Sequence, residues 1–169
     1  MNGFGLFNNE ERATGGTTGF TLLELMVTVA IVSILAALAA PQFAAWVETS
    51  RLKNGSADVR SALVLARSTA IAKNASVVVA FTTGSNSGYT VFVDNGNLVQ
   101  DSGEDVVKQG KMPSGITVAE TELPDEKACF NARGLPASSG IISVTNTEGV
   151  KIHNVILAAA GGVKIEAGS

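Results

Sequence analysis

A single carboxylic acid, Glu24, lies at the start of a long apolar stretch. From Leu25 to Ala40 the only polar residues are Thr28 and Ser33, and there is no charge. An ionised acid near the centre of a bilayer costs about 2.5–3.5 kcal/mol. Glu24 therefore needs a cationic partner or a position near a membrane interface, and we interpret it as a functional residue.

Histidine and cysteine, the usual nucleophiles, bases and metal ligands, occur once each. We expect His153 on the polar side of a strand, and Cys129, within the apolar segment 127–131, as a buried structural thiol rather than a reactive or intermolecular one. A lone cysteine cannot form an intrachain disulfide. Neither residue has a neighbour in sequence that would complete a nucleophile and base, so we predict no catalytic site and no enzyme.

Acidic residues are concentrated in the segment 94–126, although the net charge of the whole chain is only −3. We expect this segment to form a solvated loop face. The run 94–97 followed by Asp101 and Asp105 resembles part of a calcium loop, but it lacks the order and final glutamate of an EF-hand. An irregular calcium site remains an open alternative, and we predict no metal or other cofactor.

A long helix must position Glu24. The run from Phe20 to Val47 gives roughly 42 Å of helix at about 1.5 Å per residue, which exceeds the roughly 30 Å thickness of the hydrocarbon core. Beyond it the pattern becomes amphipathic, and we expect one helix over about 20–73 with its second half against a sheet. Asn54-Gly55-Ser56 is an expected weak point. The predicted buried face consists of Leu52, Val59, Leu63, Ala66 and Ala70. Lys53, Arg60 and Arg67 recur every seven residues and form a separate stripe about 100° round the helix from that face.

From residue 75 the pattern changes to short apolar and β-branched segments separated by Gly, Pro, Ser and Asn. Antiparallel strands packed on one helix form an α+β domain. We expect 94–97 to form a hairpin turn, 100–111 to form a loop and the last two strands to form a hairpin. The predicted strands are 76–82, 89–94, 116–119, 128–130, 141–145, 150–158 and 163–166.

Two segments resemble a known protein family. Gly19-Phe20-Thr21-Leu22-Leu23-Glu24-Leu25, with the apolar helix and Pro41, resembles the class III signal of type IV pilins and of the pseudopilins of type II secretion. The phrase Leu63–Ile71 resembles the helix end of the GspH/FimT group of minor pilins and pseudopilins. The resemblance covers residues 19–80 well and the remainder loosely.

This resemblance implies a pilin fold and a processing pathway. Residues 1–19 would be a leader that a prepilin peptidase removes by cutting after Gly19, 20–47 a transmembrane and assembly helix, and 48–169 a globular domain. Phe20 would become the N-methylated terminus, and Glu24 would align subunits by pairing with the Phe20 amine of a neighbour, with Pro41 as the helix proline of the family. The implied partners are the peptidase, other pilins or pseudopilins and the bacterial inner membrane, crossed once with the C-terminal domain in the periplasm.

Several alternatives remain open. The leader is not basic, with Arg12 against Glu10 and Glu11, so the true start codon is uncertain. An ordinary secretory signal cut near residues 37–39 would give a secreted binding domain, and Glu24 could lie at the interface without a partner. The sequence does not separate a type IV pilus from type II secretion.

DNA binding is the other functional alternative. Some FimT-type pilins bind DNA through a C-terminal turn resembling Gly-Arg-x-Arg, and the corresponding segment here, 161–165, lacks both arginines. Lys151, Lys164 and Arg133 are the cations that remain for such a contact. Because each phosphate contact adds to affinity, so small a set predicts weak binding to nucleic acid.

Overall fold

The computed structural model describes residues 19–168 and divides the chain into two compact units, between Pro41 and Gln42. Helix α1 (Leu22–Lys73) crosses this division, and strands follow it. They are β1 (Ser76–Thr82), β2 (Gly88–Asp94), β3 (Val106–Lys111), β4 (Ile116–Thr121), β5 (Lys127–Phe130), β6 (Gly140–Asn146), β7 (Ile152–Leu157) and β8 (Val163–Ala167), with a 3-10 turn at Pro124–Glu126.

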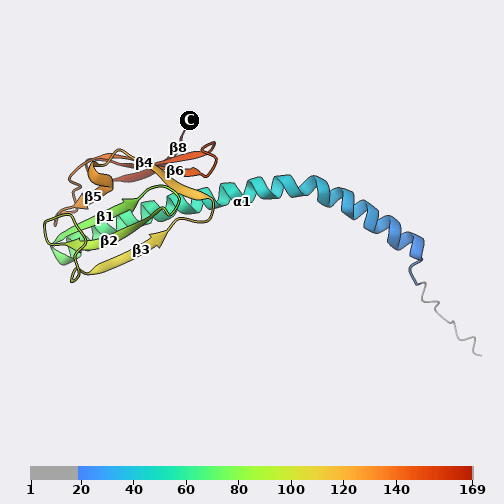
Figure 1. Ribbon diagram of the computed structural model, residues 1–169, viewed down its shortest axis with the longest axis horizontal. Coiled ribbons are helices and arrows are strands. Elements are labelled where there is room, and N and C mark those ends of the chain that lie inside the picture. Colours follow the sequence, from blue (N-terminus) through green and yellow to red (C-terminus); the bar gives the residue numbers. More distant parts are fainter. Residues whose placement is uncertain (1–18, 169) are drawn as a thin grey trace, which may run out of the picture. The chain divides into compact units, whose positions relative to one another are not determined.

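Two four-stranded sheets make up the domain of the second unit (Figure 1). The first sheet has the order β3-β2-β1-β5 and the second the order β4-β6-β7-β8, and every neighbouring pair is antiparallel. β7 and β8 pair as the expected closing hairpin. The α+β fold predicted from the sequence, with one long helix packed on antiparallel strands, is confirmed.

One face of α1 forms the centre of the core. The five residues predicted for this face are all buried, and Val59, Leu63, Ala66 and Ala70 have no exposed surface. They share one apolar cluster with residues of both sheets, among them Val79 of β1. The helix is therefore the surface on which both sheets close.

Gly55 lies inside α1 without interrupting it, which corrects the weak point expected there. It is buried, and a Cβ placed on it would lie 3.1 Å from Cγ2 of Ile116 at the start of β4. Glycine costs an isolated helix roughly 1 kcal/mol relative to alanine, but here it allows the second sheet to approach the helix closely.

The loop expected over residues 100–111 is wrong in its second half, because Val106–Lys111 forms β3. β3 is the edge strand of the first sheet, with a register shift between Val91 and Phe92 of its partner β2. The hairpin turn expected at residues 94–97 begins a longer connection, because β2 and β3 pair as antiparallel neighbours and the whole segment 95–105 joins them. A polar edge strand of this kind has too weak an apolar alternation to be found from its own sequence.

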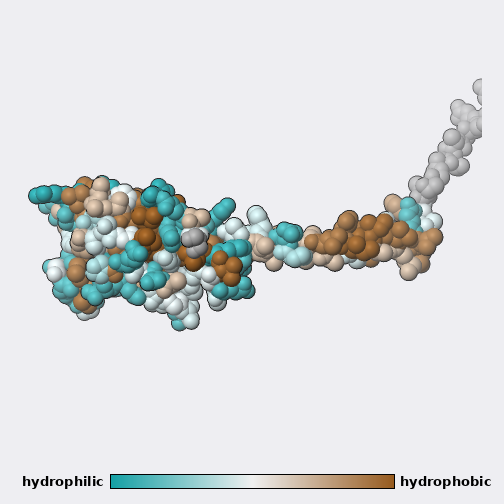
Figure 2. Space-filling model, turned by 90° about the horizontal axis from the view of Figure 1, so that it is seen from above, coloured by the Kyte–Doolittle hydropathy of each residue, from teal (hydrophilic) through white to brown (hydrophobic). Residues whose placement is uncertain are grey.

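The first part of α1 has an apolar, exposed surface, which Figure 2 shows as a brown stretch of the helix. Its most apolar 18-residue window has a mean hydropathy of 2.5. The hydroxyls of Thr28 and Ser33 donate to the backbone oxygens of Leu25 and Val29, at 2.8 and 2.7 Å. These two polar side chains are therefore satisfied within the helix and leave no unpaired hydroxyl on its apolar surface.

We expect Leu63→Ala to lower the free energy of unfolding of the domain by about 2–5 kcal/mol, because it leaves a cavity between helix and sheets. Val64→Ala is the matched control, since the adjacent Val64 is 49% exposed and its truncation should cost less than about 0.5 kcal/mol. Urea unfolding of both variants, followed by circular dichroism, measures the difference. Equal losses would show that this face of α1 is not the core.

Candidate functional site

Glu24 lies in the first turn of α1 and is exposed. Its backbone N–H donates to Oγ1 of Thr21 at 3.2 Å, so Thr21 caps the helix and Glu24 occupies its third position. A carboxylate there is favoured by the positive end of the helix dipole. Glu24 forms no ion pair within the part of the chain that the structure describes, which leaves its carboxylate available to an external cation.

The other residues predicted for processing and assembly lie close by in sequence. Gly19 and Phe20 precede α1 in exposed chain without secondary structure, and Phe20 is 84% exposed. Residues 1–18 of the predicted leader lie outside the described residues. Pro41 is inside α1, where it lacks the N–H that would bond to the oxygen of residue 37, so the helix loses one hydrogen bond.

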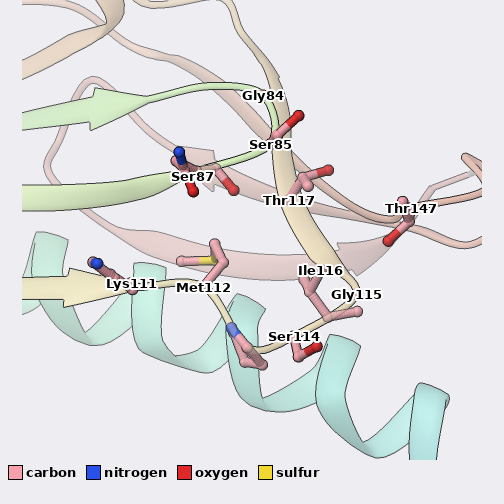
Figure 3. A pocket seen from close by; sticks show the side chains of 12 residues that line it. Gly84, Ser85, Ser87, Lys111, Met112, Ser114, Gly115, Ile116, Thr117 and Thr147 are labelled. Atoms are coloured by element: carbon pink, nitrogen blue, oxygen red, sulfur yellow. The ribbon is translucent and has the colours of Figure 1, made fainter.

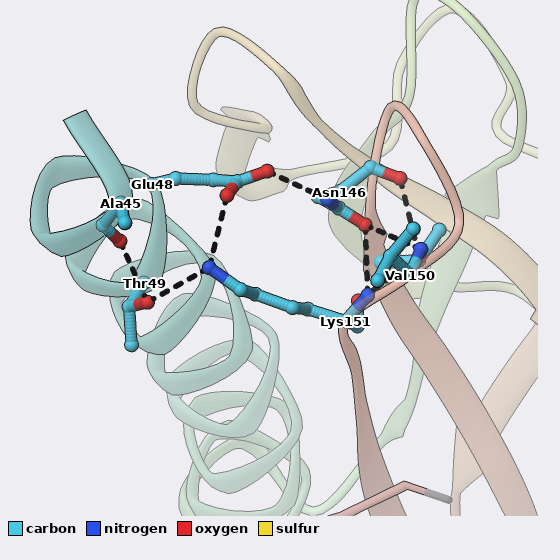
Figure 4. A network of polar contacts seen from close by, with 7 residues as sticks. Ala45, Glu48, Thr49, Asn146, Val150 and Lys151 are labelled. Carbon is cyan, nitrogen blue, oxygen red and sulfur yellow. Dashed lines mark hydrogen bonds and ion pairs between the residues drawn. The ribbon is translucent and has the colours of Figure 1, made fainter. Parts of the chain in front are cut away.

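A second polar site joins the β6–β7 turn to the helix (Figure 4). Asn146 Nδ2 donates to Oε1 of Glu48 at 2.6 Å, and Lys151 Nζ donates to Oε2 of Glu48 at 2.9 Å and to Oγ1 of Thr49 at 3.1 Å. Asn146 Oδ1 accepts the backbone N–H groups of Val150 and Lys151. The hydrogen bond from Asn146 and the ion pair with Lys151 lower the pKa of Glu48, so its carboxylate stays ionised in neutral solution.

The cations that the sequence offered for DNA lie on three different segments. Lys151 is bound by Glu48, as described above. Lys164 in β8 pairs with Glu166 at 2.5 Å. Arg133 follows β5 and is exposed. Two of the three positive charges are thus compensated within the chain, and the structure gives no direct support to a phosphate-binding surface.

Arg67 holds the β7–β8 turn against α1, a role that the sequence did not predict. Its Nη1 donates to the oxygen of Gly161, in the β7–β8 turn, at 2.8 Å. A Cβ on Gly161 would lie 3.1 Å from Cζ of Arg67, and one on Gly134 would lie 2.6 Å from Cδ1 of Ile71. Both glycines have positive φ, so they provide the turn geometry and the space that Arg67 needs. The only signal in the sequence was the position of Arg67 in the family phrase 63–71.

His153 faces α1 rather than solvent, which corrects the polar side expected for it. Its Nδ1 lies 3.2 Å from Oγ of the buried Ser56. The Ser56 hydroxyl also lies 2.8 Å from the oxygen of Leu52; when it donates there, the contact with His153 requires the tautomer that carries its proton on Nδ1. Burial, and then the positive charge of Lys53, lowers the pKa of His153. A fully buried serine cannot reach a substrate, so this pair is structural.

Cys129 is half-buried, and its Sγ lies 3.2 Å from the hydroxyl of Ser76.

The carboxylates of the acidic loop accept hydrogen bonds from backbone N–H groups of the same loop. Asp94 accepts the N–H groups of Gly96 and Leu98, and Glu104 accepts those of Asn95 and Asp101. No cluster of three metal-ligating side chains occurs among the described residues, so the calcium alternative gains no support.

A cleft of about 490 Å³ lies among three loops of the second unit (Figure 3). Its lining comes from the β1–β2 turn, from the β3–β4 connection and from Thr147. The described lining residues carry hydroxyl and amide groups and one cation, Lys111, but no acid, histidine or cysteine. The cleft therefore offers serine and threonine hydroxyls and one lysine, without a histidine or carboxylate beside them to act as a base.

The capped apolar helix and the two sheets that close on it define a pilin-like protein, and comparisons with known structures agree. The minor pilin FimU of Pseudomonas aeruginosa aligns with a TM-score of 0.56 at 16% identity, over 73% of this chain and 97% of FimU. The minor pseudopilin EpsH of the Vibrio cholerae type 2 secretion system gives 0.55, also at 16%, over 69% and 97%. The pilin fold expected from the sequence is thereby confirmed.

Sequence comparisons identify the family. The model of the type II transport protein GspH matches residues 56–161, and that of the prokaryotic N-terminal methylation motif matches residues 16–40. The chain therefore belongs to the GspH family, within the minor pilins and pseudopilins. It is 29% identical to the pilin-like protein PilA1 of Thermus thermophilus, over 88% of this chain and 97% of PilA1. It is also 33% identical to a fimbrial protein of Pseudomonas aeruginosa, over 53% and 57%.

We expect Arg67→Met to lower the free energy of unfolding by about 1–3 kcal/mol, because the oxygen of Gly161 loses a charged donor while the aliphatic stem is kept. Arg60→Met is the matched control, seven residues earlier on the same stripe of α1. The exposed Nε of Arg60 lies 3.3 Å from the oxygen of Val163. Its replacement should lower the free energy of unfolding by about 0.5 kcal/mol or less. Chemical unfolding compares the two. A larger loss in the Arg60 variant would contradict the role assigned to Arg67.

Stability should fall as the pH is lowered through 6.5. The pKa of His153 is lower in the folded chain than its ordinary value of 6.5, so the unfolded state takes up the proton first and is favoured by acid. Unfolding measured between about pH 7.5 and pH 5.5 isolates this residue, because carboxylates titrate below that range.

Two variants check the assignment of this pH dependence. His153→Gln should abolish the loss of stability between neutral and mildly acidic solution. Lys53→Gln should reduce it, since the charge of Lys53 is the second cause of the lowered pKa. An unchanged slope in His153→Gln would show that another group is responsible.

Proposed function

We propose that this chain is made as a prepilin, is cleaved after Gly19, is methylated on Phe20 and assembles with other pilins or pseudopilins. The observation that carries the proposal is Glu24, an ionisable residue at the start of an exposed apolar helix with no partner among the described residues of its own chain. Support comes from the match of residues 16–40 to the N-terminal methylation motif.

Charge pairing gives Glu24 its role in assembly. Cleavage after Gly19 creates an amine on Phe20, four positions before Glu24 in the same chain. A carboxylate in an apolar bundle is costly unless a cation compensates it, and the amine of a neighbouring subunit would supply that cation. The pairing fixes one subunit against the next, because only one axial offset brings the two charges together.

The first part of the helix would anchor the subunit in the inner membrane before assembly, with the globular domain in the periplasm. The exposed apolar surface and the mean hydropathy of 2.5 support the anchor. The internal hydrogen bonds of Thr28 and Ser33 also suit a helix in lipid. We propose that residues 20–47 form the anchor and 48–169 the domain, and that the subunit has a structural rather than a catalytic role.

Both filament systems remain compatible with the chain. Its structural neighbours are a minor pilin of a type IV system and a minor pseudopilin of a type 2 secretion system. We propose a low-copy subunit of one of these filaments, whose domain is presented at the filament surface or tip.

The mature N-terminus tests the processing. Mass spectrometry of the membrane fraction should find a chain that begins at N-methylated Phe20 and keeps the apolar helix. A chain that begins near Ala40 would overturn the proposal and make this a secreted domain.

Glu24→Gln tests assembly separately from processing. We expect the variant to be cleaved normally but to be strongly depleted from sheared filaments, because it cannot pair with the neighbouring amine. Glu122→Gln, which removes an exposed acid of the globular domain, should enter filaments as the native chain does. Normal incorporation of Glu24→Gln would remove the pairing.

A further inference from the structure

Two aromatic side chains lie exposed on α1 where the apolar stretch ends. Phe43 and Trp46 each leave 65% of their surface exposed. Their rings are in contact, with centroids 5.9 Å apart and planes inclined by 34°. Residues three positions apart share a helix face, so the pair forms one apolar patch, which the described part of its own domain leaves uncovered.

The sequence on either side of the pair indicates what covers it. The segment from Leu25 to Gln42 contains no charge and is close to the about 20 residues that a helix needs to cross the hydrocarbon core. The first charged residues after the pair are Glu48, Arg51 and Lys53. Phe43 and Trp46 thus lie at the change from apolar to charged sequence.

Tryptophan has the chemistry of a membrane interface. Its large ring prefers an apolar environment while its N–H needs a polar partner, and both needs are met at the level of the lipid headgroups. Phenylalanine extends the apolar part of the same patch toward the acyl chains. In water the two rings would leave a large apolar area unburied.

We propose that Phe43 and Trp46 lie in the headgroup layer of the membrane and set the depth of the anchored helix. The partner is the lipid interface itself, chosen over a neighbouring helix because the change in sequence character occurs at this turn. Glu24 precedes Phe43 by 19 residues, about 28 Å of helix, a length close to the roughly 30 Å hydrocarbon thickness. The inference rests on the membrane anchoring proposed above and is independent of filament assembly.

Trp46 is the only tryptophan of the chain, so its fluorescence reports the depth without a label. The full-length chain is placed in vesicles of phosphatidylethanolamine and phosphatidylglycerol that carry bromine at a shallow or a deep acyl position. We expect the shallow bromine to quench more strongly, and the calculated depth to be about 15 Å from the bilayer centre, half of the hydrocarbon thickness.

Two matched variants calibrate the measurement, each in a Trp46→Phe background. Leu35→Trp and Ala57→Trp move the indole by the same number of residues in opposite directions, about 16 Å of helix each. Leu35 is exposed in the apolar stretch and Ala57 is exposed beside the domain. The deep bromine should quench Leu35→Trp most strongly, and Ala57→Trp should emit as an indole in water with no quenching.

Each contrary result overturns the inference. If Trp46 is quenched by neither lipid and emits as Ala57→Trp does, its ring lies outside the bilayer. If the deep bromine quenches Trp46 as strongly as Leu35→Trp, its ring lies in the hydrocarbon core. A blue-shifted emission that depends on the protein-to-lipid ratio, without quenching by either lipid, shows a second copy covering the patch. If Leu35→Trp also escapes quenching, the anchoring itself fails, which separates that outcome from an error in the depth alone.

Discussion

The burial of one face of α1 is the constraint on which the rest of the domain depends. Leu63, Ala66 and Ala70 lose all contact with solvent, and the two alanines are small enough to bring both sheets close to the helix axis. Nearer the N-terminus of α1, Gly55 allows Ile116 of β4 to approach the helix equally closely. Because a single helix supplies the surface for two sheets, neither sheet has a complete core without it.

Polar contacts place the strands on this helix at several levels. Glu48 binds the β6–β7 turn through Asn146 and Lys151, Ser56 meets His153, and Arg67 binds the β7–β8 turn. The basic and acidic side chains of the domain are in this way used largely for internal contacts. Among the described residues, the first part of α1 presents an exposed apolar surface, and Glu24 at its start forms no ion pair.

The sequence predicted the parts of the fold that local patterns determine. The helix face from Leu52 to Ala70 follows from a 3.6-residue period, and most strands follow from β-branched runs between turn residues. β3 escaped detection because it is a polar edge strand with little apolar alternation, and the ion pair of Lys108 with Asp58 that ties it to α1 joins residues 50 positions apart. The roles of Arg67 and Glu48 were hidden because their partners lie in distant turns that no local pattern connects to the helix.

The contacts of Glu48 also impose an order in time. A chain is synthesised from its N-terminus. All of α1 is therefore made well before the residues that bind Glu48. Asn146 and Lys151 follow Glu48 by 98 and 103 residues, and Arg67 waits for Gly161. The first sheet ends at Phe130, so it can cover α1 while the second sheet is still incomplete. The polar partners of Glu48 and Arg67 come last, in the β6–β7 and β7–β8 turns, and these contacts can therefore form only when those turns have been made.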